Sequence, residues 1–126
     1  MTKSAIQLKR AYEPPGPHDG KRFLVERLWP RGVKKNELDL EAWLKDVAPS
    51  AGLRKWFSHD PAKWDEFRRR YFAELETAKD ALAPLLDAVR KGRLTLVYSS
   101  RDEEHNNALA LKEYLEAKLH RKRKAA

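Results

Sequence analysis

Two short segments of the sequence carry side chains that can do acid–base or anion-binding chemistry. The first is SSRDEEHNN, residues 99–107, in which Asp102 and His105 stand three positions apart. A helix that starts here would place both side chains on one side of its first turn. His105 can then act as a general acid or base, with Asp102 orienting its ring. The backbone N–H groups of such a helix start also form a natural pocket for an anion.

The second segment is VERLWPRG, residues 25–32, where an apolar run changes abruptly into charge, tryptophan, proline and glycine. Strand periodicity puts Arg27 on the same face as Phe23 and Trp29, so its guanidinium is expected to be partly buried. A desolvated guanidinium needs a carboxylate, a phosphate or several carbonyls. Ligand binding and a structural ion pair are equally good interpretations. The rigid turn at Pro-Arg-Gly can aim Arg31 outwards, and Trp29 is hard to assign to packing.

Each of these residues also has a plain structural explanation. Asp102 near a helix start favours the helix dipole, and His105 can be an ordinary first-turn residue. Asp60 is best explained as a helix N-cap, whereas His59 beside it has no such role. The chemistry of His59, His105 and Asp102 permits a metal, but neither H-x-x-x-H nor H-x-H spacing occurs. No metal site is therefore predicted, and the sequence assigns no cofactor.

Three predicted strands must position the two segments. Residues 5–12 alternate apolar and polar side chains, residues 22–28 form a second strand, and residues 93–98 form the most apolar one. Helical segments separate the later strands. The pattern predicts an α/β fold: a small single domain with a short, at least partly parallel sheet packed by helices. Ligands in such sheets bind at the carboxyl ends of the strands, so the two segments are expected to meet there.

Capping signals and apolar spacing predict the helices. Asn36 can cap a helix that stops before Pro49. Its apolar positions are Leu40, Trp43, Leu44 and Val47. Ser50 caps a short helix after it. Ser100 and Glu103 have the spacing of a capping box, so the last helix is predicted to start there.

A longer helix is predicted between these two. Asp60 serves as its N-cap and Pro61 occupies the first helical position. Pro84 is expected to kink or divide this helix, and Gly92 is well placed to end it.

Length and charge indicate one domain with a basic end. The 126 residues contain no linker-like segment, which predicts a single domain over residues 1–120 and a disordered tail at 121–126. The tail carries four basic residues of a chain whose net charge is +8. Without the tail, the net charge of the domain is about +4, which is ordinary for its size. Nucleic-acid binding is an alternative function, and it would use the tail, Arg68-Arg69-Arg70 and Trp29.

Hydropathy and cysteine usage exclude several classes. No apolar run approaches the roughly 18 residues that a membrane-spanning helix needs. The first residues, MTKSAIQLKR, contain no apolar stretch typical of a signal peptide. The chain has no cysteine, which excludes disulfides, thiolate metal sites and a cysteine nucleophile. A cytoplasmic protein without a membrane partner is expected, and no pattern sets its oligomeric state.

Three motifs resemble the YeaO-like family, a bacterial and archaeal family catalogued as a domain of unknown function. They are ERLWPRG, DVAPSAGLRKWFSHDPAKWDEFRRRYFAEL and TLVYSSRDEEHNNALALKEYL. The resemblance runs from about residue 5 to about residue 118, in the same order and spacing. It implies a compact α/β domain, and the family has no settled biochemical activity.

The resemblance also marks individual positions. It adds Ser50 and Arg54 to the candidates for ligand binding. The full set of these candidates is Arg27, Trp29, Arg31, Ser50, Arg54, His59 and Asn106, and the catalytic candidates are Asp102 and His105. The family's motif carries an aspartate where this chain has Glu26, and one extra methylene shifts the carboxylate if that group does chemistry.

These patterns favour a small enzyme or ligand-binding protein. Arg27 and Arg31 would hold an anionic small molecule, phosphorylated or nucleotide-like, and His105 would supply acid–base chemistry. Two alternatives stay open beside it. One is a nucleic-acid-binding protein. The other is a non-catalytic regulatory or scaffold domain, in which the Arg, Asp and His side chains only hold the fold.

Overall fold

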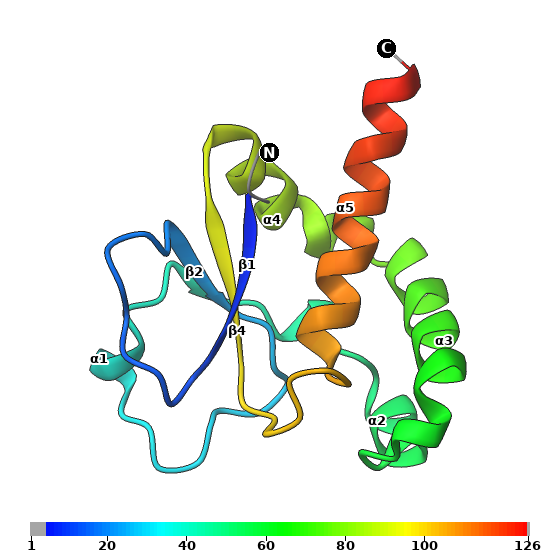
Figure 1. The fold of residues 1–126 in the computed structure, drawn as a ribbon, viewed down its shortest axis with the longest axis horizontal. Helices are drawn as coiled ribbons and strands as arrows, with labels where there is room; N and C mark the ends of the chain where they lie inside the picture. Colours follow the sequence, from blue (N-terminus) through cyan, green and yellow to red (C-terminus); the bar gives the residue numbers. More distant parts are fainter. Residues whose placement is uncertain (1–4, 126) are drawn as a thin grey trace.

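A parallel sheet forms the centre of the protein (Figure 1). The computed structural model describes residues 5–125, and the side chains of residues 5–120. Within this part the strands are β1 (Ile6–Arg10), β2 (Lys21–Leu24), β3 (Ala42–Trp43) and β4 (Leu94–Tyr98). Their order across the sheet is β1-β4-β2-β3, and every pairing is parallel. The predicted α/β class is confirmed, and all carboxyl ends of the strands lie at one edge of the sheet.

Helices cover the sheet unequally. Their bounds are α1 (Lys35–Leu38), η1 (Lys45–Val47), α2 (Ala51–Phe57), η2 (Pro61–Lys63), α3 (Trp64–Glu76), α4 (Lys79–Lys91) and α5 (Asn107–Ala125), where η marks a 3-10 helix. α3, α4 and α5 lie on one side of the sheet, and α1 lies on the other (Figure 1).

Two hydrophobic cores lie on the two faces of the sheet. The larger core packs buried side chains of α3, α4 and α5 against Leu94 and Leu96. In the smaller core, Leu24 and Val97 pack against Leu38. Leu96 and Val97 are neighbours in sequence and point to opposite faces, as strand geometry requires. β4 is therefore buried on both sides, which explains why it is the most apolar strand.

The prediction of one helix from Asn36 to Val47 is wrong, because this range contains α1, β3 and η1. α1 ends after a single turn because Asp39 adopts a left-handed conformation, with φ of 49°. The chain then forms β3 beside β2, and Leu44 N–H donates to the Leu24 carbonyl. The helix-like spacing of the apolar residues has another cause. Leu40 and Trp43 pack into the smaller core, whereas Leu44 and Val47 pack into the larger one.

The long helix predicted after Asp60 is divided at a different place from the expected one. Asp60 caps the helical start through the Ala62 N–H, as predicted, and Gly92 ends α4. The break lies between Glu76 and Lys79, however, and Pro84 is inside α4. At the break, the Thr77 hydroxyl donates to the Glu74 carbonyl and competes with the helical backbone bonds.

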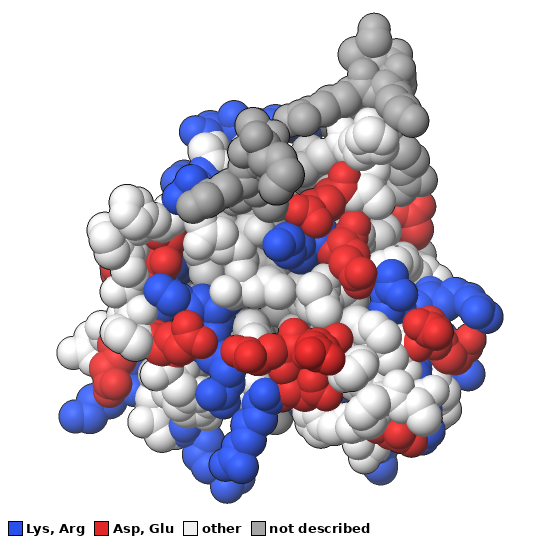
Figure 2. All heavy atoms as spheres, in the orientation of Figure 1, with Lys and Arg blue, Asp and Glu red and all other residues white. Residues whose placement is uncertain are grey.

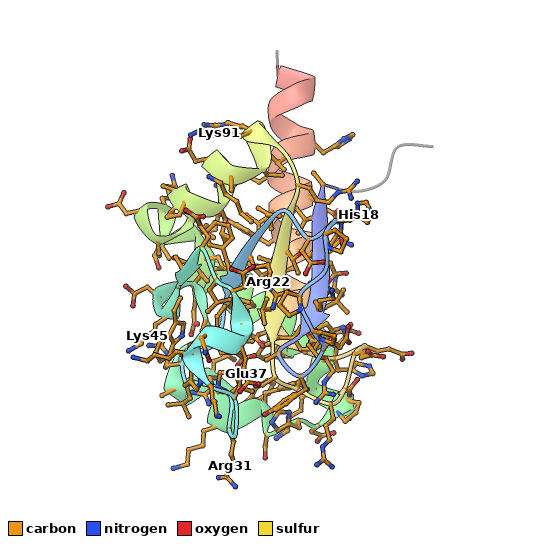
Figure 3. All side chains as sticks on the ribbon, turned by 90° about the vertical axis from the view of Figure 1, so that its left-hand side faces the viewer. His18, Arg22, Arg31, Glu37, Lys45 and Lys91 are labelled. Carbon is orange, nitrogen blue, oxygen red and sulfur yellow. The ribbon has the colours of Figure 1, made fainter. Side chains whose placement is uncertain are left out.

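A buried ion pair fixes the loop between β1 and β2. The Asp19 carboxylate is 5% exposed and lies 2.7 Å from Nη1 of Arg22, which is 3% exposed (Figure 3 labels Arg22). Lys9 Nζ lies 3.1 Å from the other oxygen of the carboxylate. Arg22 Nε also donates to the Leu38 carbonyl, so the pair joins β1, β2 and α1. Gly20 follows at φ 65°, where a Cβ would lie 2.0 Å from the Arg93 carbonyl oxygen.

The ends of the chain add two findings. None of the helices in residues 5–125 combines the length and the apolar character that crossing a bilayer requires. The backbone of α5 continues to Ala125, but the side chains of the basic tail lie outside the described residues. The disorder predicted for residues 121–126 stays a prediction.

Removing the buried carboxylate should destabilise the fold strongly. Asp19→Ala is expected to lower the free energy of unfolding by about 3–5 kcal/mol, because it leaves the buried Arg22 charge without its carboxylate. Asp87→Ala removes an exposed ion pair with Lys91 and is the control, with an expected loss below about 1 kcal/mol. Denaturant unfolding measures both values. Equal losses in the two variants would contradict the special role of the buried pair.

Candidate functional site

A cleft of about 800 Å³ opens at the carboxyl ends of β2 and β4. One wall is formed by α2 and the residues before it, and the other by the loop between β4 and α5. Glu26 lies in the cleft directly after β2. The predicted candidates that line the cleft are Arg54, His59, Asp102, His105 and Asn106. The cleft lies where a parallel sheet usually binds its ligands.

The cleft begins where the pairing of β2 and β4 ends. The last backbone bond between the two segments runs from the Val25 N–H to the Val97 carbonyl. Beyond it, side chains take over. The Val25 carbonyl accepts a 2.9 Å hydrogen bond from Asn107 Nδ2, and the Ser99 N–H donates to Glu26 Oε1 over 3.4 Å. The segments after β2 and β4 separate here because the Val25 carbonyl and the Ser99 N–H bond to side chains and not to each other's backbone.

Glu26 lines the cleft and is a further candidate that the sequence-based candidate set left out. Its carboxylate is partly buried, and the long contact from Ser99 is its one hydrogen bond within the described part of the chain. Burial raises the pKa of Glu26, and the Ser99 N–H and the nearby Arg54 charge oppose this rise without cancelling it. Its position at the end of a strand, one residue before Arg27, is the signal that could have identified it.

Asp102 and His105 contact each other as predicted. His105 Nδ1 lies 3.0 Å from Asp102 Oδ2, and the His105 ring packs edge-on against Trp64 with centroids 5.5 Å apart. Asp102 Oδ1 accepts the N–H groups of Glu104 and His105. The hydrogen bond from Glu104 and the contact with His105 lower the pKa of Asp102. A neutral His105 that donates from Nδ1 carries its free lone pair on Nε2.

The last helix starts later than predicted. α5 begins at Asn107, and its N-cap is Asn106, whose Oδ1 accepts the Leu109 N–H over 2.8 Å. Asn106 Nδ2 donates to the Asp102 carbonyl. The predicted capping box at Ser100 is therefore wrong, because Ser100 Oγ instead accepts the Asp102 N–H within a turn. Asn106 is buried and its side chain is used by this cap, although it lines the cleft.

Arg54 is the cation best placed for a ligand. Ser50 caps α2, the helix that carries Arg54, by accepting the Leu53 N–H. The Arg54 side chain is half-buried and lines the cleft. Among the described residues, no acceptor lies within hydrogen-bond or ion-pair distance of its guanidinium. Lys55 and Arg101, both exposed, also line the cleft.

Arg27 supports the cleft wall from outside its lining. Its Nε donates to the Pro49 carbonyl over 3.2 Å, and its Nη2 donates to the Ala48 carbonyl over 3.3 Å. The partners of this guanidinium are therefore carbonyl groups. Ser50 is also outside the lining, and its hydroxyl donates to Glu74 Oε2 over 2.6 Å. Both side chains fix the segment that leads into α2.

Trp29 and Arg31 lie away from the cleft. Trp29 packs edge-on against Trp43 with centroids 5.4 Å apart, on the face of the smaller core, and its Nε1 donates to the Val33 carbonyl. Arg31 is exposed, and Figure 3 shows it at the lower tip of the molecule with its side chain extended away from the ribbon. His59, in contrast, lines the cleft as an exposed residue after α2, at φ 56°.

The described residues contain no group of three or more His, Asp or Glu side chains that could hold a metal ion. This finding covers the described part of the chain only. The candidate chemistry of the cleft therefore consists of the Asp102–His105 pair, the partly buried Glu26 carboxylate and the Arg54 guanidinium.

The protein is a small α/β domain with a parallel sheet and a cleft at the carboxyl ends of its strands. Comparisons with known proteins identify its family. A family model described as "Inactive DUF488-N3 subclade" matches residues 5–126. The uncharacterized protein YeaO of Escherichia coli (strain K12) is 44% identical over 110 residues, which cover 87% of this chain and 96% of the relative. The uncharacterized protein Rv3073c of Mycobacterium tuberculosis (strain H37Rv) is 37% identical over 115 residues, which cover 91% of this chain and 97% of the relative.

The chain therefore belongs to the YeaO-like family, and the resemblance seen in its motifs is confirmed. No solved structure matches the chain significantly.

Neutralising Glu26 should stabilise the protein near neutral pH. Because burial raises its folded pKa, the ionised carboxylate destabilises the fold at every pH above that value. Glu26→Gln is therefore expected to raise the melting temperature at neutral pH. The gain should disappear below about pH 4, where the carboxyl group is protonated in the unfolded chain too.

Melting temperatures measured across this pH range test the expectation. Glu104→Gln removes an exposed carboxylate of the neighbouring loop and serves as the control, with little change expected at any pH. A lower melting temperature for Glu26→Gln at neutral pH would show that the charge of Glu26 stabilises the fold instead.

Proposed function

We propose that this protein binds a small anionic molecule, phosphorylated or nucleotide-like, in the cleft at the carboxyl ends of β2 and β4. The observation that carries the proposal is the state of Arg54. The residue is half-buried in the cleft wall, and its guanidinium faces no acceptor within the described residues. Removing a charged group from water is unfavourable unless a partner replaces the water, and an anionic ligand is such a partner.

The surroundings of Arg54 support the same ligand class. Lys55 and Arg101 add positive charge along the cleft, and Phe57 and Phe67 add an apolar part. A volume of about 800 Å³ lies within the usual range for small-molecule sites, which is about 300–1,000 Å³. A ligand with a charged group and an apolar ring matches both parts of the cleft.

Binding without catalysis agrees best with the description of the family, which calls this subclade inactive. Acid–base catalysis by His105 is the second candidate, and the geometry of the Asp102–His105 pair favours it. Asp102 holds Nδ1, which leaves Nε2 of a neutral ring to accept a proton. Both candidate functions, binding alone and catalysis by His105, require that the anionic ligand binds in the cleft.

Nucleic-acid binding receives less support from the described side chains. Arg68 pairs with Glu113, and Arg69 and Arg70 both pair with Glu66, so this cluster is largely neutralised. On the face drawn in Figure 2, acidic and basic side chains are mixed, and a group of acids gathers near its lower middle. A face that binds nucleic acid would carry a continuous patch of Lys and Arg side chains.

A purely structural role explains only part of the candidate set. The contacts of Arg27 with two carbonyls and of Ser50 with Glu74 hold the fold. They do not explain why Arg54 is half-buried without a partner. A scaffold domain is therefore the weaker proposal. A cytoplasmic location stays a prediction from the sequence.

Thermal shift with wild type and two arginine variants tests the proposal. Phosphate, pyrophosphate, sugar phosphates and nucleotides serve as probes, because a ligand that binds only the folded state raises the melting temperature. A probe at about a hundred times its Kd adds about 2.7 kcal/mol to stability, which is a shift of several degrees. Arg54→Ala is expected to weaken binding roughly tenfold to a hundredfold, the usual loss of a charge-assisted hydrogen bond.

Arg31→Ala is the matched control, because it removes an exposed arginine that lies away from the cleft. It should leave the shift unchanged. If no anion stabilises the wild type, or if both variants lose the shift equally, Arg54 is not the ligand's partner and the proposal is wrong.

A further inference from the structure

The cleft contains a carboxylate beside the cation proposed to hold an anion. Glu26 comes from the end of β2, and the Arg54 charge on α2 is close enough to lower its pKa. Within the described residues, the charged and titratable groups that interact electrostatically with Glu26 from the surrounding elements are Arg54 of α2 and Tyr71 of α3. The Ser99 N–H contacts one carboxylate oxygen, and within the described residues no donor contacts the other.

This arrangement restricts the ligand. An anion bound at Arg54 brings a second negative charge close to Glu26, and like charges in a partly buried site repel. A ligand that is only anionic therefore binds at a disadvantage. A ligand that also presents an N–H donor to the open oxygen of Glu26 replaces that repulsion with a charge-assisted hydrogen bond.

The apolar part of the cleft adds a third requirement. Phe57 and Phe67 line it, and both belong to the larger core, are 6% and 2% exposed, and stack on each other with centroids 4.3 Å apart. The part of these rings that stays open to the cleft is small, and a flat ring in the ligand can contact it. The three features together describe a molecule with an acidic group, a planar ring and an amino group.

We propose that Glu26 selects nucleoside monophosphates whose base carries an exocyclic amino group. The phosphate binds at Arg54 and Arg101, the base lies along Phe57 and Phe67, and the amino group donates to the open carboxylate oxygen of Glu26. This inference rests on the proposed function, because it names the ligand class of the same cleft. A partly buried carboxylate that disfavours simple anions and accepts a hydrogen bond from an amino group gives selectivity, since the wrong ligand leaves the polar group of the site unpaired.

Matched pairs of nucleotides test the inference. AMP and IMP differ at the exocyclic group, an amino group in AMP and a carbonyl oxygen in IMP, and at the neighbouring ring nitrogen, which accepts a hydrogen bond in AMP and donates one in IMP. CMP and UMP differ in the same way, and purine riboside 5′-monophosphate, which lacks the amino group of AMP but keeps the acceptor nitrogen, isolates the effect of the amino group. Titration calorimetry at about pH 8 gives the Kd of each. The wild type is expected to bind AMP or CMP at least tenfold more tightly than its carbonyl counterpart.

Three carboxylate variants assign the preference to Glu26. Glu26→Gln should remove the preference, because an amide can both donate and accept, whereas Glu26→Asp keeps the carboxylate and should keep the direction of the preference. Glu104→Gln is the control for loss of a nearby negative charge and should bind like the wild type. Melting temperatures without ligand verify that each variant is folded.

The outcomes separate this inference from the proposed function. Inorganic phosphate and pyrophosphate are titrated in parallel. If neither these anions nor any nucleotide binds, the proposed function and this inference are both overturned. If nucleotides bind and Arg54→Ala weakens them, but AMP equals IMP and CMP equals UMP, only the selectivity of Glu26 is overturned. The same holds if Glu26→Gln keeps the full preference.

Discussion

The parallel pairing of β2 with β4 is the constraint on which the site depends. The pairing places the carboxyl ends of the two strands side by side and ends at the bond between Val25 and Val97. Beyond this bond, the Val25 carbonyl accepts from the Asn107 side chain and the Ser99 N–H donates to the Glu26 side chain. The two segments therefore separate and form parts of the two walls of the cleft. The side chains of the cleft come from the segments after β2 and β4, from α2 and its flanking residues, and, in the case of Phe67, from α3. A change of register between β2 and β4 would separate Glu26 from the loop after β4.

Stability and chemistry are concentrated in different parts of the molecule. The ion pair of Asp19 and Arg22 is buried and holds the loop that leads into β2, while two hydrophobic cores hold the faces of the sheet. In the cleft, Glu26 and Arg54 are partly buried and are not matched to each other by an ion pair. Unmatched charges of this kind reduce stability and are common at functional sites.

The motifs of the family contain two kinds of residue. Arg27 and Ser50 fix the segment before α2, and Trp29 packs with Trp43 on the far face of the sheet. Arg54 and the Asp102–His105 pair, in contrast, line the cleft. A motif that looks like one site is therefore partly a support for it. The supporting residues keep α2 at the right place beside the strand ends.

The sequence by itself determined the class of fold, the presence of three of the strands, the cap of α2 at Ser50 and the contact of Asp102 with His105, because these depend on local pattern and short separations. The second strand was predicted to run to residue 28, but it ends at Leu24, since its pairing with β4 gives way to side-chain contacts after Val25. Tertiary structure decided the rest. The residues around Trp43 formed a strand because β2 offered an open edge, and α5 began at Asn107, capped by Asn106, because Ser100 was used in a turn. Only the tertiary structure showed that Arg54 has no partner among the described residues and that Glu26 lies in the same cleft. Whether a charge is left without a partner depends on neighbours that are distant in the sequence, and no local pattern contains them.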